Sequence, residues 1–140
     1  MKSCVFHDTG PGQQERQLFE IVDRAYIGRE KVLIFAQTEE RAAAIDRILW
    51  IFKQESFIPH RIFDRNEPDS TMPVAIVTSE INPIEAGILI ADGHCSLEFA
   101  GGFDSVHEFV NRASPEIQQA CRDRFRAYRS LQIPVEHVKE

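Results

Sequence analysis

Three short runs of the chain are apolar on successive residues rather than on alternate ones. They are Lys31–Gln37, Pro73–Thr78 and Gly87–Ala91, and each is too short for a typical helix. A strand with this pattern is buried on both faces, as strands in a parallel sheet are. Parallel strands need crossover connections, which are usually helices. The runs therefore predict a mainly parallel sheet covered by helices on both faces.

Apolar residues at helical spacing predict where the covering helices lie. We expect helices over 13–27, 39–52, 103–111 and 114–131. Thr38 is a suitable N-cap for the second of these, and Ser114 followed by Pro115 starts the last. Val106, Phe109 and Val110 would face inward from the third.

The remaining segments are shorter. Cys4–His7 reads as a first strand, 57–60 as extended chain, and the residues after Pro134 as a tail. Ser96–Ala100 alternates like an edge strand, whereas Gly101 and Gly102 favour a loop, so both readings stay open. The predicted fold class is α/β: a single domain over residues 1–140, three-layer α/β/α and Rossmann-like, with no nucleotide fingerprint.

Charge and cysteine content narrow the function classes. The formal net charge is −6, which argues against a protein that grips nucleic acid mainly through phosphates. From Arg112 onward six Lys and Arg face four Asp and Glu, so this end carries +2 and the rest −8. Three widely separated cysteines and no signal peptide predict a reduced, cytoplasmic protein. No apolar run approaches the roughly 20 residues of a membrane span.

No catalytic or metal-binding pattern stands out. Gly10-Pro11-Gly12 follows the first strand, but Glu15 occupies the place of the third glycine of a dinucleotide fingerprint. Cys4-x-x-His7 and His94-Cys95 lack a second ligand pair, and nothing marks Cys95 as an activated thiol. We therefore expect no catalytic residues, no metal and no cofactor, and favour a binding module. The alternative is a Rossmann-like nucleotide-dependent enzyme with a phosphate site at Gly10–Gly12.

The last predicted helix combines a basic and an apolar stripe. Arg122, Arg126 and Arg129 share one face, and Cys121, Phe125 and Tyr128 repeat the same spacing one residue earlier. Arg124 points elsewhere. Such a ridge suits a peptide that is acidic, hydrophobic and ends in a free carboxylate. The competing interpretation is that the aromatic residues are core and the arginines only face solvent.

A stretch rich in aromatic residues follows the second predicted helix. It runs from Leu49 to His60 and contains Trp50, Phe57 and Pro59, residue types that anchor protein–protein contacts. Trp50 lies about 100° round the helix from the buried Leu49. Helix geometry alone favours a core position for Trp50, under the following loop.

Several motifs in this order resemble the chi subunit of bacterial DNA polymerase III, an accessory protein of the clamp-loader complex. They are Lys31-Val32-Leu33-Ile34 with Glu39-Glu40, Ile45-Asp46 before Leu49-Trp50, Ser56-Phe57-Ile58-Pro59-His60, and Arg122-x-Arg124-Phe125-Arg126-x-Tyr128-Arg129. The resemblance runs from Lys2 to about His137. It implies a non-catalytic α/β adaptor that supports DNA replication.

The resemblance implies two partners. The first is single-stranded DNA-binding protein, whose acidic C-terminal tail ends in Ile-Pro-Phe and binds beside the last helix. The matching residues here are Ile117, Arg122, Phe125, Arg126 and Arg129. Position 118, often basic in the family, is Gln118, so we expect weaker affinity or a basic group from elsewhere.

The second implied partner is the psi subunit of the clamp loader, with an XPD-like helicase as a competitor for the same surface. That surface includes Trp50, Phe57 and Pro59, which moves Trp50 from the core to an exposed anchor. Strong direct DNA binding and membrane contact are not expected. A further alternative is an adaptor of this fold that has lost both partners, for which Gln118 is the hint.

Overall fold

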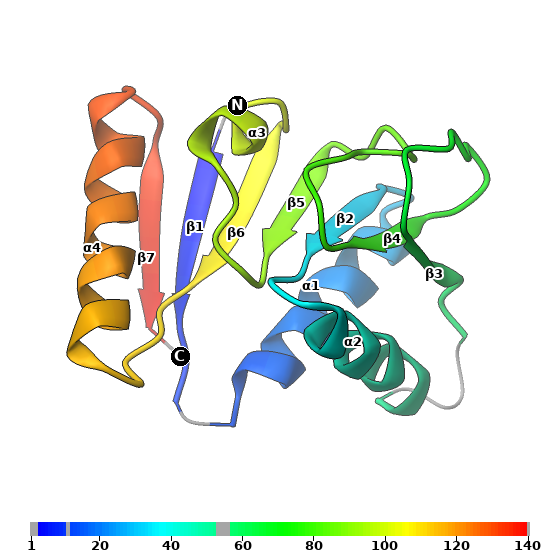
Figure 1. Cartoon of the computed structure of the whole chain (residues 1–140), viewed down its shortest axis with the longest axis horizontal. Helices are drawn as coiled ribbons and strands as arrows, with labels where there is room; N and C mark the ends of the chain where they lie inside the picture. The colour runs from blue at the N-terminus through cyan, green and yellow to red at the C-terminus, as the bar shows by residue number, and fades with distance from the viewer. Residues whose placement is uncertain (1–2, 11, 53–56, 140) are drawn as a thin grey trace.

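A computed structural model describes residues 3–10, 12–52 and 57–139, and that part of the chain contains one seven-stranded parallel sheet (Figure 1). The strand order is β3-β4-β2-β5-β6-β1-β7. The strands are β1 (Ser3–Asp8), β2 (Val32–Phe35), β3 (His60–Phe63), β4 (Val74–Val77), β5 (Ile88–Ala91), β6 (Ser105–Phe109) and β7 (Val135–Lys139). Every described pairing is parallel, which confirms the predicted sheet.

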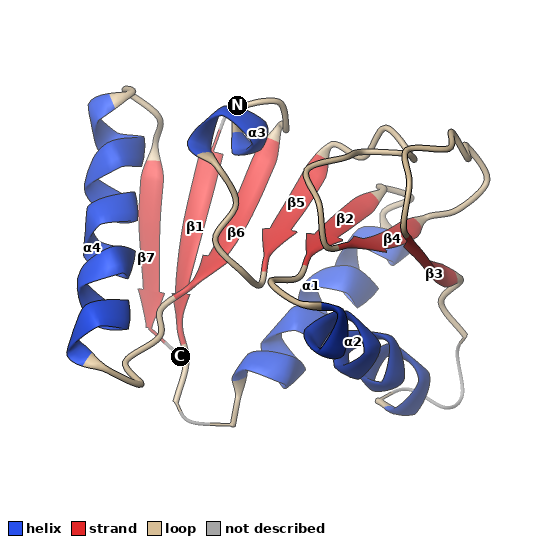
Figure 2. Ribbon diagram, in the orientation of Figure 1, coloured by secondary structure: helices blue, strands red, loops and turns tan. Residues whose placement is uncertain are grey.

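The helices lie on both faces of the sheet (Figure 2). They are α1 (Gln14–Ile27), α2 (Glu39–Ile51), α3 (Leu97–Ala100) and α4 (Pro115–Ser130). Val32 and Ile34 of β2 pack with α1 and α2, whereas Leu33 and Phe35 belong to the core on the face of α3 and α4. Successive strand residues point to opposite faces, so two cores explain why the strands are apolar at every position. The three-layer α/β/α fold is confirmed.

Two segments predicted as helix or tail are strands. Residues 103–111 do not form a helix: β6 lies inside the sheet, between β5 and β1. The spacing of Val106 and Phe109 is compatible with a helix or a strand. The segment is a strand because its backbone pairs with β5 on one side and with β1 on the other. The tail after Pro134 contains β7, a parallel edge strand, and the Cys4 amide donates to the Pro134 carbonyl at 3.0 Å as the ladder begins.

Two further segments depart from the predictions. The extended chain at 57–60 leads into β3, the opposite edge strand, which was not predicted. Ser96–Ala100 is neither an edge strand nor a plain loop, because Leu97–Ala100 is the short helix α3. The Ser96 hydroxyl accepts a hydrogen bond from the Phe99 amide at 3.1 Å, which caps the helix.

A buried ion pair sets the rotation of α4 on the sheet. The Arg124 guanidinium donates to both carboxylate oxygens of Glu108 on β6, at 2.9 and 2.5 Å. The Tyr128 hydroxyl donates to the same carboxylate at 2.7 Å, and burial raises the pKa of this hydroxyl, which keeps it protonated. The Glu108 side chain is 1% exposed. With Arg124 turned inward, Arg122, Arg126 and Arg129 face outward.

The described residues contain no helix that is both long and apolar enough to cross a membrane.

Candidate functional site

An apolar cavity of about 250 Å³ opens between α4 and the β7 edge of the sheet. Its floor and walls come from β1, from the segment after β6, from α4 and from β7. The lining residues are Phe6, Val110, Arg112, Gln118, Cys121, Arg122, Phe125 and His137. The rings of Phe6 and Phe125 meet edge to face with centroids 5.2 Å apart. The cavity is therefore an aromatic-walled pocket with cationic and polar side chains among its lining.

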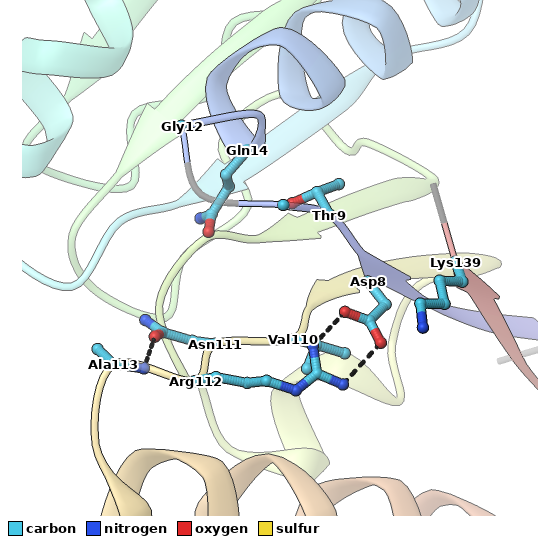
Figure 3. A pocket seen from close by; sticks show the side chains of 10 residues that line it. Asp8, Thr9, Gly12, Gln14, Val110, Asn111, Arg112, Ala113 and Lys139 are labelled. Atoms are coloured by element: carbon cyan, nitrogen blue, oxygen red, sulfur yellow. Dashed lines mark hydrogen bonds and ion pairs between the residues drawn. The ribbon is translucent and has the colours of Figure 1, made fainter.

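The cationic side of this cavity is held in place by Asp8. Arg112 donates to both Asp8 oxygens, to Oδ2 at 2.8 Å (Figure 3). His137 Nε2 lies 2.9 Å from the same Oδ2. The Asp8 side chain is 4% exposed. Hydrogen bonding from Arg112 lowers the pKa of Asp8 from 3.8 to about 2, so the carboxylate is ionised at neutral pH. The end of β1 thus fixes a guanidinium between β6 and α4.

The structure brings together only part of the predicted tail site. Arg122 and Phe125 line the cavity. Arg126 and Arg129 are exposed on α4 outside the lining, with the Arg129 guanidinium 6.0 Å from the Phe125 ring centroid. Ile117 is exposed in the first turns of α4. The role of these residues in peptide binding stays a prediction.

The apolar stripe of α4 divides between core and surface. Cys121 and Tyr128 are buried, whereas Phe125 is half-buried and faces the cavity. Sequence reasoning missed the cavity residues that come from the sheet and from the segment after β6: Phe6, Val110, Arg112 and His137. The net charge of the chain becomes positive from Arg112 onward, and this was the one sequence signal that pointed to Arg112. His137 could be placed at the site only once β7 was known to be an edge strand.

A crevice of about 520 Å³ adjoins the cavity at the carboxyl ends of the strands (Figure 3). Its described lining consists of Asp8, Thr9, Gly10, Gly12, Gln14, Val110, Asn111, Arg112, Ala113 and Lys139. The chain leaves β1 toward α1 on one face and β6 toward α4 on the other. Crevices at such a reversal are common ligand sites in α/β proteins.

The crevice contains the phosphate site proposed by the nucleotide-dependent alternative, but its side chains are poorly suited to bind a phosphate. The Asp8 carboxylate lines the same crevice as Gly10 and Gly12 and would repel a phosphate bound there, and Arg112 is paired with Asp8. A side-chain carbon built on either glycine would meet no atom within 4 Å, so neither glycine is needed for close packing. Pro11, the middle residue of this motif, lies outside the described residues.

A second cluster lies at the other edge of the sheet, where α2 ends and β3 begins. Trp50 is 54% and Phe57 56% exposed, and their ring centroids are 4.8 Å apart. His60 packs beneath, 5.1 Å from the Trp50 ring, and Pro59 is half-buried. Exposure of Trp50 contradicts the core position expected from helix geometry. Ser56, part of the motif here, lies outside the described residues.

The surroundings of Cys95 do not favour a reactive thiol. Burial raises the pKa of the Cys95 thiol to about 11, which disfavours the thiolate that catalysis needs. His94 Nε2 lies 3.9 Å from Cys121 rather than pairing with Cys95. Among the described residues no three His, Cys, Asp or Glu side chains are placed to hold a metal ion.

Comparisons with known proteins agree with the motifs. Residues 1–136 match the family model described as DNA polymerase III chi subunit, HolC. The chain is 30% identical over 135 residues to DNA polymerase III subunit chi of Pseudomonas aeruginosa strain PAO1, covering 94% of this chain and 90% of that protein. It is 30% identical over 137 residues to the Escherichia coli K12 subunit chi, covering 92% of each chain.

One solved structure extends the fold comparison. It is the C-terminal domain of S. cerevisiae Dbp5 bound to Gle1 and IP6, with a TM-score of 0.60 and 14% identity. The match covers 99% of this chain and 90% of that one, and at this identity it bears on the fold alone.

Proposed function

The chain belongs to the DNA polymerase III chi subunit family and so has an accessory role in DNA replication, and from this we propose that it is a non-catalytic tether. It links the clamp-loader complex in the cytoplasm to single-stranded DNA-binding protein. The link is made by binding the acidic C-terminal tail of that protein. The second partner is the psi subunit, or an XPD-like helicase that uses the same surface.

The observation that carries the tail proposal is the cavity beside α4. Its aromatic walls suit the terminal Phe of an Ile-Pro-Phe tail, and its volume of about 250 Å³ admits one aromatic side chain. Arg122 on the cavity wall and Arg126 on the exposed face of α4 suit the acidic residues that precede this Phe. An apolar pocket with cations around it is what a hydrophobic peptide with acidic flanks requires.

Binding through a protein tail agrees with the charge of the chain. A protein of net charge −6 is poorly suited to hold DNA phosphates directly, but it can follow the DNA through the protein that coats it. Coat proteins that present several tails also raise the effective concentration of the peptide, so a modest single-site affinity is sufficient.

The test is fluorescence anisotropy of a labelled tail peptide titrated with the protein at low and moderate salt. We expect a Kd around micromolar, equivalent to about −8 kcal/mol, that weakens as salt is added. A matched peptide that ends in Ala instead of Phe should bind at least tenfold more weakly. Equal binding of both peptides, or no binding of the tail, would refute the proposed function.

The second surface is the exposed cluster of Trp50 and Phe57. We predict that Trp50→Ala weakens psi binding by at least tenfold, because exposed tryptophans are frequent hot spots of interfaces. Its free energy of unfolding should change by only about 0.5 kcal/mol, as expected for an exposed side chain. Isothermal titration calorimetry with psi and a urea denaturation curve measure the two effects.

The matched control for this prediction is Leu131→Ala, which truncates an apolar side chain that is 58% exposed near α4, at the opposite edge of the sheet. It should leave psi binding unchanged. A Trp50→Ala variant that unfolds easily would instead mean that Trp50 supports the core, and unchanged psi affinity would remove Trp50 from the interface.

A further inference from the structure

We infer that Arg112 binds the terminal carboxylate of the captured peptide, while the arginines of α4 hold its acidic side chains. This inference rests on the proposed function and adds a residue outside α4. Arg112 follows β6 and lines both the 250 Å³ cavity and the neighbouring crevice. Arg112 therefore lies at the mouth of the cavity, next to the place where the main-chain carboxylate of a terminal residue would be if its side chain filled the cavity.

The guanidinium of Arg112 is fixed before any ligand arrives. Its two terminal nitrogens donate to the two oxygens of Asp8, and the Asp8 carboxylate is nearly fully buried and also contacts His137. Asp8 ends β1 and His137 lies on β7, so two neighbouring strands hold the position. A side chain held in this way loses little conformational entropy when it binds a second partner.

The pairing with Asp8 uses two of the N–H donors of Arg112. A guanidinium has five N–H donors in a planar fork. Asp8 occupies the edge formed by the two terminal nitrogens, and the edge formed by Nε and its neighbouring nitrogen can donate to another carboxylate. The Arg112 side chain is 52% exposed and lines the cavity, and binding of the carboxylate requires that this second edge is the one a ligand there reaches.

The chemistry favours a carboxylate over a phosphate at this position. The Asp8 charge largely cancels that of Arg112, so the attraction comes from directed hydrogen bonds more than from net charge. A planar carboxylate with one charge fits a two-donor edge, whereas a phosphate would bring more negative charge close to Asp8. Gln118, also in the cavity lining, can add a neutral amide donor.

The test compares a tail peptide that ends in a free carboxylate with the same peptide ending in an amide. We expect amidation to weaken binding to the unmodified protein about tenfold, the size of a charged hydrogen bond. In Arg112→Gln the same amidation should cost less than twofold. The matched control Arg126→Gln should weaken both peptides and keep the tenfold ratio, since Arg126 acts on the acidic side chains.

The outcomes distinguish a failure at Arg112 from a failure of tail binding as a whole. If the unmodified protein binds the tail but amidation costs the same with and without Arg112, this inference is overturned and the proposed function stands. If the unmodified protein binds neither peptide, both fail. Because Arg112→Gln leaves the buried Asp8 with less compensation, the double variant Asp8→Asn/Arg112→Gln repeats the comparison with a neutral pair, and it should show the same loss of carboxylate preference.

Discussion

An Arg124→Leu variant is expected to lose about 3 to 5 kcal/mol of unfolding free energy, because the substitution leaves a buried carboxylate without its cation. Glu108 lies inside the sheet, with its side chain 1% exposed, and takes two of its hydrogen bonds from Arg124. Tyr128 would remain as a neutral donor. One hydroxyl cannot replace a guanidinium that forms a bidentate pair.

Chemical denaturation followed by far-UV circular dichroism measures this effect. Arg122→Leu is the matched control, since it removes an exposed arginine from the same helix and should change stability by about 0.5 kcal/mol. The double variant Glu108→Gln/Arg124→Leu should recover part of the loss by removing the unpaired charge. A single variant within about 1 kcal/mol of the unmodified protein would show that Glu108 is not dependent on Arg124.

Charge reversal on the outer face of α4 should have the largest effect on binding. Arg122→Glu or Arg126→Glu is expected to abolish measurable binding of the tail peptide, because each places a carboxylate where the acidic peptide needs a cation. Both side chains are exposed, so the unfolding free energy should move by only about 0.5 kcal/mol. Anisotropy with the labelled tail, together with a denaturation curve, measures the two quantities.

Arg16→Glu provides the control for net charge. Arg16 is exposed on α1, which covers the other face of the sheet, and its reversal changes the charge of the protein by the same amount. Tail binding should be nearly unchanged in this variant. If both α4 variants bind like the unmodified protein, the tail does not bind at this helix.

Local sequence patterns correctly predicted the elements whose residues all lie in the same kind of surroundings. The strands β2, β4 and β5 are buried on both faces, so their composition alone identifies them. The helices α1 and α4 show helical spacing and, for α4, a cap at Ser114 that the structure contains. The strand β6 was mistaken for a helix because its polar residues, His107 and Glu108, are accommodated by tertiary partners that no local pattern reveals.

Only the part of the candidate site that lies on α4 could be predicted from the sequence, for a related reason. Arg122 and Phe125 lie on one helix, so their spacing placed them together. Phe6, Arg112 and His137 are separated by about a hundred residues or by a change of element, and the strand order alone makes β1, β6 and β7 neighbours. Sequence spacing does not contain that order, so the basic group expected to compensate for Gln118 could not be assigned to a residue.

The strand order also determines how far apart the two proposed binding surfaces lie. Helix α4 and strand β7 lie at one edge of the sheet, and α2 and β3 lie at the other (Figure 1). The cavity beside α4 is therefore at the β7 edge, and the cluster of Trp50 and Phe57 is at the β3 edge. Across the described sheet these edges are six strand spacings apart, or about 29 Å. Groups this distant, with no shared contacts, contribute additively to free energy. Under the proposed function the domain is then a passive spacer, and occupancy of one edge leaves the affinity at the other unchanged. A double variant of Trp50 and Arg122 should bind psi as the Trp50 single variant does and bind the tail as the Arg122 single variant does.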